Sequence, residues 1–195
     1  MVLVLDTSNT MFERKRDGKM YFFDFSVIKQ EAINLITGLS DKAFFNVVIY
    51  ESGSQAYDTQ MILADGSAKK LAAEWIRSLD EDPAMTIAKR PGRAETKLLE
   101  GKGTRLDTAL KQTLGFQPSV VFILTDGEVK RVEEGVFRWL GELRKLKPAA
   151  EVHVIQYVTQ KTTEEETEIL RKIASRGGGK FKTVEAATLS QGPRE

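Results

Sequence analysis

The sequence predicts an α/β protein in which helices cover both faces of a mostly parallel β-sheet. Two observations carry this prediction. Short apolar runs alternate with amphipathic helical segments along the chain. In addition, "VLVL" (2–5) and the core of "SVVFILTDG" (119–127) are continuous apolar runs, as in strands buried on both faces. The chain has 195 residues, 41% of them hydrophobic, and is therefore long enough for one domain with a real core.

Each expected element has its own local signal. β-Branched and aromatic residues favour strands, whereas apolar side chains at helical spacing behind a Ser or Thr favour capped helices. A capping box of Thr163 and Glu166 marks the start of the last helix. Besides 2–5, strands are expected at 43–50, at 54–59 as an edge hairpin partner, within 119–127, at 151–158 and at 180–184; helices are expected from Ser26, from Ser67, over about 104–114, and over 132–146 and 163–179. Residues 81–103, broken by Pro and Gly, are expected to be mostly loop.

Composition excludes several classes of function. The net charge of +1 gives no global field toward nucleic acids or membranes, and no apolar run approaches the ~20 residues of a membrane span. The absence of cysteine excludes disulfides and thiolate metal sites, so a metal would need oxygen ligands or the single histidine. We expect that histidine, His153, to be structural because it has no second histidine beside it, and Trp75 and Trp139 to belong to the core.

We expect a single domain over residues 1–187 and a polar tail or linker over 188–195. The first strand follows directly on Met1 and the chain stops in polar residues, which predicts a domain excised from a larger protein. A bacterial membrane-anchored or exported parent fits this expectation, and composition leaves the compartment open.

Oxygen-bearing side chains gather where the predicted strands end. Asp6 ends the first strand and is followed by Ser8 and Thr10, Asp126 ends the strand in "VFILTD", and Thr104 begins a helix just before that strand. In parallel sheets, sites form beyond the carboxyl ends of the strands. All these side chains are hard oxygen ligands, so the set suits Mg²⁺ or Mn²⁺. Its two carboxylates balance the ion, and an open position could then take a carboxylate from a partner.

At these residues the sequence resembles the von Willebrand factor A domain family. Its metal-ion-dependent adhesion site has the pattern D-x-S-x-S, with a Thr in a second loop and an Asp in a third. Here these stand as Asp6-Thr7-Ser8-Asn9-Thr10, Gly103-Thr104 and Thr125-Asp126-Gly127. Thr10 replaces the final Ser and keeps the hydroxyl, and Asn9 replaces a usual Gly.

The resemblance implies a Rossmann-like three-layer sandwich with a six-stranded, mostly parallel sheet in the order 3-2-1-4-5-6 and one antiparallel edge strand. It also implies a protein-binding module without catalytic activity. The hydroxyls of such a site bind the ion directly or through water, the aspartates often act through water, and a partner's Asp or Glu completes the shell. Some members of the family switch by movement of their last helix, which here would be 163–179.

Other readings of the same residues stay open. Thr104 could cap its helix together with Asp107, and Asp6 with its hydroxyls could form a metal-free Asx-turn network in a scaffold domain. An enzymatic alternative is an Mg²⁺-dependent phosphatase of the haloacid-dehalogenase type with Asp6 as nucleophile. That chemistry normally uses a second aspartate two residues later, where this chain has Ser8, so we expect no catalysis.

Basic residues cluster in the loops 13–19 and 88–105, next to the predicted metal loops. They could form a collar that attracts an acidic protein surface, or be solvated loops. Nucleic acid is not expected as a partner because no aromatic side chains interleave with the charges. The residues of this basic collar are Arg14, Lys15, Arg16, Lys19, Lys89, Arg90, Arg93, Lys97, Lys102 and Arg105.

Overall fold

The main sheet has the strand order that the sequence analysis expects. The computed structural model describes residues 1–8, 13–16, 19–22, 25–79, 104–158 and 162–185. The sheet runs in the order β5-β4-β1-β7-β8-β9, with β5 antiparallel to β4 and all other neighbours parallel. Counted along the chain, these strands have the order 3-2-1-4-5-6, so the Rossmann-like prediction is confirmed. The strands are β1 (Val2–Asp6), β4 (Phe44–Tyr50), β5 (Ser54–Ala56), β7 (Val120–Thr125), β8 (Glu151–Val158) and β9 (Gly178–Glu185).

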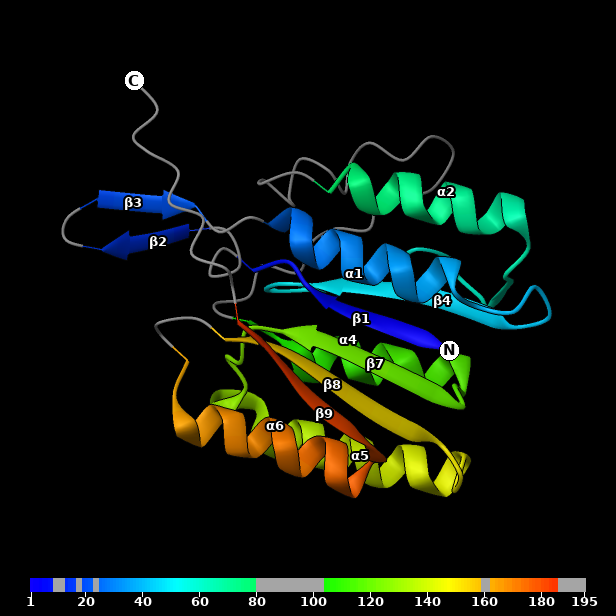
Figure 1. Cartoon of the computed structure of the whole chain (residues 1–195). Helices are drawn as coiled ribbons and strands as arrows, with labels where there is room; N and C mark the ends of the chain where they lie inside the picture. Colours follow the sequence, from blue (N-terminus) through cyan, green and yellow to red (C-terminus); the bar gives the residue numbers. More distant parts are fainter. Residues whose placement is uncertain (9–12, 17–18, 23–24, 80–103, 159–161, 186–195) are drawn as a thin grey trace.

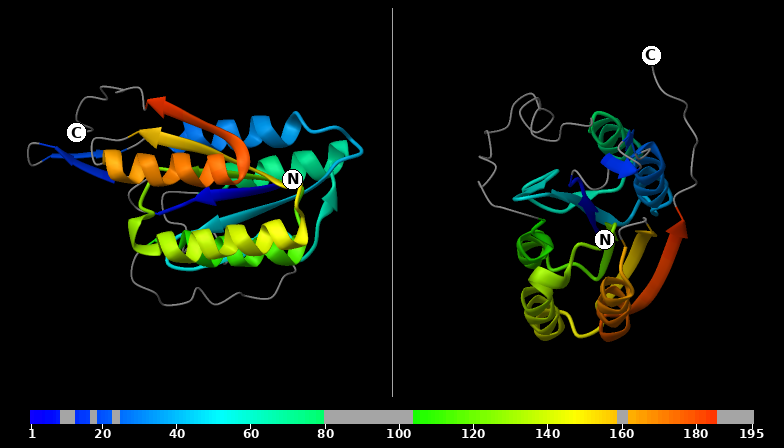
Figure 2. Two further views of the ribbon diagram at one scale, coloured as in Figure 1. Left: turned by 90° about the horizontal axis from the view of Figure 1, so that it is seen from below. Right: turned by 90° about the vertical axis from the view of Figure 1, so that its left-hand side faces the viewer.

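Helices enclose this sheet on both faces, which gives the expected three layers (Figure 1; Figure 2). Among the described residues, two α-helices pack on one face and three on the other. The first pair is α1 (Phe25–Thr37) and α2 (Gly66–Arg77), and the opposite layer holds α4 (Leu106–Thr113), α5 (Glu133–Leu146) and α6 (Glu164–Arg176). Within the described part of the chain, none of the helices has both the length and the apolar character that crossing a bilayer requires.

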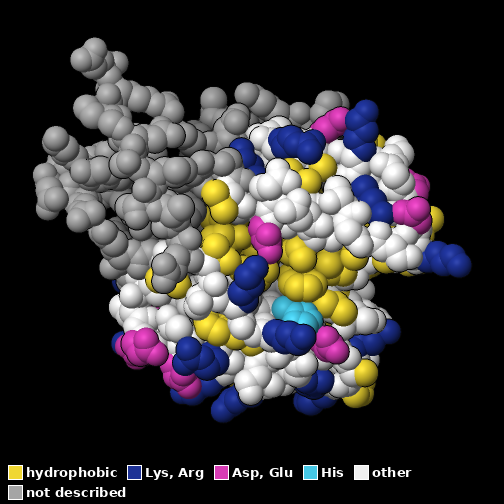
Figure 3. Space-filling view, in the orientation of Figure 1, with side chains coloured by type: hydrophobic (Ala, Val, Ile, Leu, Met, Phe, Trp, Pro, Cys, Tyr) yellow, Lys and Arg dark blue, Asp and Glu magenta, His cyan; other side chains and the backbone are white. Residues whose placement is uncertain are grey.

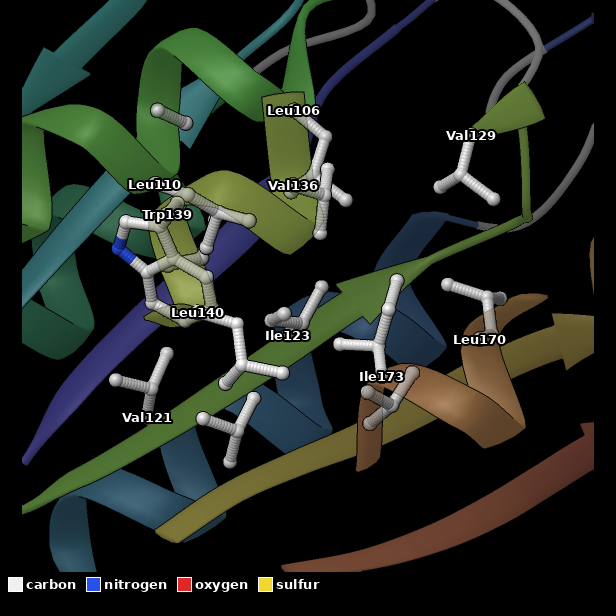
Figure 4. Packing of buried hydrophobic residues seen from close by; sticks show 14 of the residues in the cluster. Leu106, Leu110, Val121, Ile123, Val129, Val136, Trp139, Leu140, Leu170 and Ile173 are labelled. Atoms are coloured by element: carbon white, nitrogen blue, oxygen red, sulfur yellow. The ribbon is translucent and has the colours of Figure 1, made fainter. Parts of the chain in front are cut away.

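The continuous apolar runs form the middle of two cores. Alternate residues of β1 face opposite helix layers: Val4 packs toward α4, α5 and α6, whereas Leu3 and Leu5 pack toward α1 and α2. All of β1 is buried because it lies between β4 and β7 with helices on both sides. Figure 4 shows the first core, where Trp139 and Leu140 of α5 meet β7.

Trp139 belongs to the core, as expected, whereas Trp75 is half-buried. Trp139 is 2% exposed, and its Nε1 donates to Thr113 Oγ1 at 3.1 Å, so its one polar atom is satisfied. Trp75 packs against the other core, with its ring tilted against Tyr57 at a centroid distance of 5.1 Å.

His153 is held by structural contacts on the face shown in Figure 3, where the histidine lies beside hydrophobic side chains. The Lys180 backbone N–H donates to Nδ1 at 3.0 Å, and Nε2 lies 3.1 Å from a Glu151 oxygen. An acceptor role for Nδ1 places the proton of the neutral ring on Nε2, which donates to Glu151. The ring also stacks on Phe122 at 4.7 Å.

The charged segment after the first strand contains a hairpin that the sequence analysis did not predict. β2 (Glu13–Arg16) and β3 (Lys19–Phe22) pair antiparallel as a separate two-stranded sheet. In Figure 1 this hairpin projects away from the main sheet. The intervening sequence is Asp17-Gly18, a dipeptide that strongly favours two-residue hairpin turns. The flanking sequence "ERKRDGK" is highly charged and has no alternation of apolar and polar residues, so it does not indicate strands on either side of this turn.

Smaller differences concern caps and strand lengths. Asp65 rather than Ser67 is the N-cap of α2, and its Oδ1 accepts the Ala68 N–H at 2.8 Å. A short strand, β6 (Ile62–Leu63), pairs antiparallel with the start of β4 and adds a seventh strand to the sheet. The predicted loop at 81–103 lies outside the described residues.

α6 is fixed by a capping box at its start and by the strand that follows its end. The predicted capping box is present: Thr163 Oγ1 accepts the Glu166 N–H at 3.2 Å, and the Glu166 carboxylate accepts the Thr163 N–H at 3.2 Å. Leu170 and Ile173 of this helix are fully buried. β9 follows α6 in the chain and pairs with β8, so α6 connects two neighbouring strands of the main sheet.

Candidate functional site

A row of polar side chains crosses the carboxyl edge of the sheet. The parallel register places Asp6 beside Tyr50 of β4 and Thr125 beside Gln156 of β8. Thr125 Oγ1 donates to Asp6 Oδ2 at 2.8 Å, which joins the two pairs. None of these four side chains is more than 1% exposed. The row therefore forms a buried polar layer between the apolar core and the loops at this edge.

Asp6 is the centre of this row and accepts hydrogen bonds on both carboxylate oxygens. Oδ1 accepts the Ser8 backbone N–H at 2.9 Å, and Oδ2 accepts the hydroxyls of Tyr50 at 3.0 Å and Thr125 at 2.8 Å. Burial raises the pKa of Asp6, although these bonds and one from the Ser8 side chain act to lower it. No cationic side chain among the described residues pairs with Asp6. Its negative charge is therefore only partly compensated.

Asp126 lies in the loop after β7 and is 6% exposed. Burial raises the pKa of Tyr50 well above its ordinary value, and the charges of Asp6 and Asp126 add to the effect. Of these two carboxylates, Asp6 contacts the Tyr50 hydroxyl directly, at 3.0 Å. Gly127, at φ +119°, turns the chain after Asp126, and a Cβ there would lie 3.0 Å from Gln156 Nε2.

Thr104 reaches this edge from the start of α4. The Arg105 N–H donates to the Glu51 carbonyl at 2.8 Å, which ties the segment to the loop after β4. Thr104 Oγ1 donates to Glu128 Oε2 at 3.0 Å, which ties it to the loop after β7. The structure does not give Thr104 the capping role that the alternative expects. Arg105 is the N-cap of α4 and makes no side-chain cap bond among the described residues.

Some of the predicted residues lie outside the described part of the chain. These are Thr10 and the basic residues between 88 and 102, and of the β2–β3 hairpin the structure describes the backbone. Arg105 of the basic collar is described, and it pairs with Asp107 through two contacts of 2.9 Å. This hydrogen bonding lowers the pKa of Asp107. The Arg105 guanidinium is thus engaged within its own segment.

Tyr50, Gln156 and Glu128 were not predicted as residues of this edge, and Thr125 was named only as the neighbour of Asp126 in the third motif element. Three of them are simply the last inward-facing positions of predicted strands, two residues after a core valine or isoleucine. Aligning the strands by their polar ends would have found the row, because neighbouring residues of parallel strands share a face. Glu128 has no such signal, because its place depends on the turn at Gly127.

The donors at this edge fit a small hard cation. Ser8, Thr104, Asp6 and Asp126 offer only oxygen atoms, the ligands that Mg²⁺ and Mn²⁺ prefer. Among the described residues no three Asp, Glu or His side chains gather as a metal-binding group, so an ion would depend on the hydroxyls as well. The four donors on Asp6 nearly fill its acceptor capacity, which fits an aspartate that acts on an ion through water.

Several solved structures are similar to this chain, and one of them is a von Willebrand factor type A protein. A von Willebrand factor type A protein from Catenulispora acidiphila matches with a TM-score of 0.61 and 21% identity over 94% of this chain. A variant of an aerotolerance-related membrane protein from Bacteroides fragilis matches with a TM-score of 0.63 and 15% identity, covering 94% of this chain and 90% of that one. The PilB minor pilin from Streptococcus sanguinis matches with a TM-score of 0.52 and 14% identity, covering 95% and 57%.

No family model matches the sequence, and no curated protein matches it. The chain spans 38% of the length of the Catenulispora chain that it matches. Fold and strand order nevertheless agree with the resemblance seen in the sequence. The chain has the α/β fold of von Willebrand factor A domains.

Proposed function

We propose that the chain is a protein-binding module that holds Mg²⁺ or Mn²⁺ at the carboxyl edge of its sheet and offers the ion to an Asp or Glu of a partner. One observation carries this proposal: the Asp6 carboxylate is fully buried, is surrounded by hydroxyl and amide donors, and pairs with no described cation. A buried charge without a counter-charge is costly, and a bound cation relieves that cost.

The residues have distinct roles in this proposal. Ser8, Thr10 and Thr104 would offer hydroxyl oxygens to the ion, whereas Asp6 and Asp126 would supply negative charge, directly or through water. The ion supplies a position with affinity for a carboxylate. Because two carboxylates balance a divalent ion, a third carboxylate from a partner is not repelled. The hydroxyl donors on Asp6 fix the orientation of its carboxylate, as supporting hydrogen bonds do in metal sites.

A phosphatase reaction has less support from the same site. A nucleophilic aspartate needs a carboxylate oxygen free to attack, whereas both oxygens of Asp6 accept hydrogen bonds and the side chain is 0% exposed. The residue two positions later is Ser8, which cannot act as the general acid of that chemistry. A metal-free scaffold domain is the remaining alternative, and the following experiment separates it from the proposal.

Calorimetric titration of EDTA-treated protein with Mg²⁺ and Mn²⁺ tests the proposal. We expect the wild type to bind one ion and Asp126→Asn to bind far more weakly. Asp41→Asn is a matched control, because Asp41 is an exposed carboxylate at the other end of the sheet, 2.7 Å from Lys69 Nζ. It should bind as the wild type does. If the wild type binds neither ion, the proposal is wrong and the metal-free scaffold domain is the alternative that remains.

The partner's carboxylate can be imitated with acetate. In the Mn²⁺-loaded protein, acetate should lower the paramagnetic relaxation of water protons, because it displaces water from the ion. If acetate has no effect at concentrations that leave the ion bound, the ion does not present an open position and the carboxylate-binding part of the proposal is wrong.

A further inference from the structure

The Thr104 hydroxyl does not cap α4, because Arg105 and not Thr104 is the N-cap residue of that helix. A Thr directly before a helix ordinarily caps it by accepting a backbone N–H. Here α4 begins at Leu106 behind Arg105, without a side-chain cap bond among the described residues. The Thr104 hydroxyl instead donates its single proton to Glu128 Oε2 at 3.0 Å. This bond connects two loops that are 24 residues apart in the chain.

The direction of that hydrogen bond matters for metal binding. A threonine hydroxyl has one proton and two lone pairs. When the proton is held by Glu128, both lone pairs of the Thr104 oxygen remain available to accept a hydrogen bond or to contact a cation. A ligand that donates to a carboxylate is also a better electron donor, as metal-bound histidines with carboxylate partners are. The bond to Glu128 would therefore prepare Thr104 to act as a ligand.

The loop after β7 is built so that Glu128 can make this contact. Gly127 has φ +119°, a conformation that L side chains rarely adopt, and the Val129 N–H donates to the Gly127 carbonyl at 2.6 Å. This tight turn leaves Asp126 buried and Glu128 exposed. Because Glu128 takes no part in the core, its ordered contact with Thr104 is not a by-product of packing.

We infer that Glu128 is a positioning residue of the metal site, which orients the Thr104 hydroxyl toward the ion and strengthens it as a ligand. The inference rests on the proposed function and extends it, because Glu128 lies outside the motif residues of the site. Glu128 acts through Thr104 in this scheme and is not itself a ligand. Its contribution must therefore disappear when the Thr104 hydroxyl is absent.

A double-mutant cycle on Mn²⁺ and Mg²⁺ affinity tests this dependence. Glu128→Ala should weaken binding about tenfold, in the range found for residues that orient metal ligands. Thr104→Val, which keeps the shape and removes the hydroxyl, should weaken binding at least as much. The double variant should bind no more weakly than Thr104→Val alone. Glu128→Gln retains an acceptor for the hydroxyl and should recover part of the affinity.

Glu165→Gln is the control for long-range charge. Glu165 is an exposed acid of the first turn of α6, 2.6 Å from Lys130 Nζ, so the variant removes one negative charge without touching Thr104. It should change the affinity less than twofold. Thermal melting of each metal-free variant checks that folding is unchanged.

Three results would overturn the inference. An unchanged affinity in Glu128→Ala shows that Thr104 needs no orientation. An equal loss in the Thr104→Val background shows that Glu128 acts by its charge or as a ligand. In both cases the wild type binds the ion and the proposed function stands. Absence of binding in the wild type overturns the proposed function itself, and the inference falls with it.

Discussion

Substitution of Asp6 should separate the structural from the functional value of this carboxylate. We compare Asp6→Asn, which removes the charge and keeps the shape, with Asp6→Ala, which removes both. If the carboxylate is there to hold an ion, Asn should leave the metal-free protein as stable as the wild type or more stable, and Ala should destabilise it. Both variants should lose the response to Mg²⁺.

The size of these effects follows from the contacts of Asp6. In the Ala variant the Ser8 N–H and the hydroxyls of Tyr50 and Thr125 lose their acceptor. Each buried donor left alone costs about 1–3 kcal/mol, and release of the buried charge offsets part of the sum, so we expect a loss of about 3 kcal/mol. At about 2–4 °C per kcal/mol for a chain of this length, Tm falls by about 6–12 °C.

The Asn variant keeps an acceptor for the Ser8 N–H, and its amide can donate to a hydroxyl oxygen. Burial raises the pKa of Asp6, which means that the folded protein disfavours the ionised carboxylate at neutral pH. Removing that charge should therefore change the free energy of unfolding by no more than about 1 kcal/mol, toward higher stability.

Differential scanning calorimetry with EDTA, and then with excess Mg²⁺, measures both effects. At a free ion concentration of about 100 times Kd, binding adds about 2.7 kcal/mol. The wild-type Tm should then rise by about 5–10 °C, and that of Asp6→Asn should not move. Two results would refute the reasoning: an Asn variant as unstable as Ala without metal, or an Asn variant that retains the wild-type shift with Mg²⁺.

Further predictions concern pH and single positions around the site. The metal-free protein should lose stability as pH rises through the folded-state pKa of Asp6, because the folded state binds that proton more tightly than the unfolded chain. This loss of stability is absent below about pH 4, the ordinary pKa of Asp, and it stays constant above the folded-state pKa of Asp6. Urea unfolding across this range measures it, and Asp6→Asn should lack this component. Gln156→Met should raise the free energy of unfolding by about 1 kcal/mol, since neither amide atom has a hydrogen-bond partner among the described residues; a lower urea midpoint would contradict this. Gly127→Ala should cost about 1–3 kcal/mol in thermal melting because of φ +119° and the close Gln156 amide, and wild-type stability would show that the turn adapts. Thr163→Ala should cost about 1 kcal/mol through the capping box of α6, whereas Thr163→Ser should cost little.

The fold could be predicted because burial dictates its strands directly. Val2–Leu5 and Val120–Leu124 are apolar at every position, and only a strand covered on both faces needs such a run. Helical periodicity then identified the connections between them. The β2–β3 hairpin was not predicted, and it pairs as a sheet separate from the main one. Its sequence carries a turn signal in Asp17-Gly18 but no alternation.

The candidate site could be predicted only in part, and the division has a physical reason. The sequence indicates which residues end the strands, hence Asp6 and Asp126. It does not indicate the register between strands, which is a tertiary property, so Tyr50 and Thr125 were not recognised as donors to Asp6. The contact of Thr104 with Glu128 could not be predicted for the same reason, because the position of Glu128 is set by a turn in another loop.

The proposed metal site would account for the polar row at the carboxyl edge of the sheet. The register that aligns Val4 with Val48 in the core also aligns the next inward positions, Asp6 and Tyr50, at the carboxyl edge. An apolar pair at that point would extend the core and add stability, as at every earlier position of these strands. The chain instead buries a carboxylate there and surrounds it with hydroxyl donors that fix it without neutralising it. A purely structural turn needs neither the burial nor the charge, because an asparagine would accept the Ser8 N–H equally well. The cation that we propose would balance this charge, so the metal response of Asp6→Asn decides between a metal site and a turn.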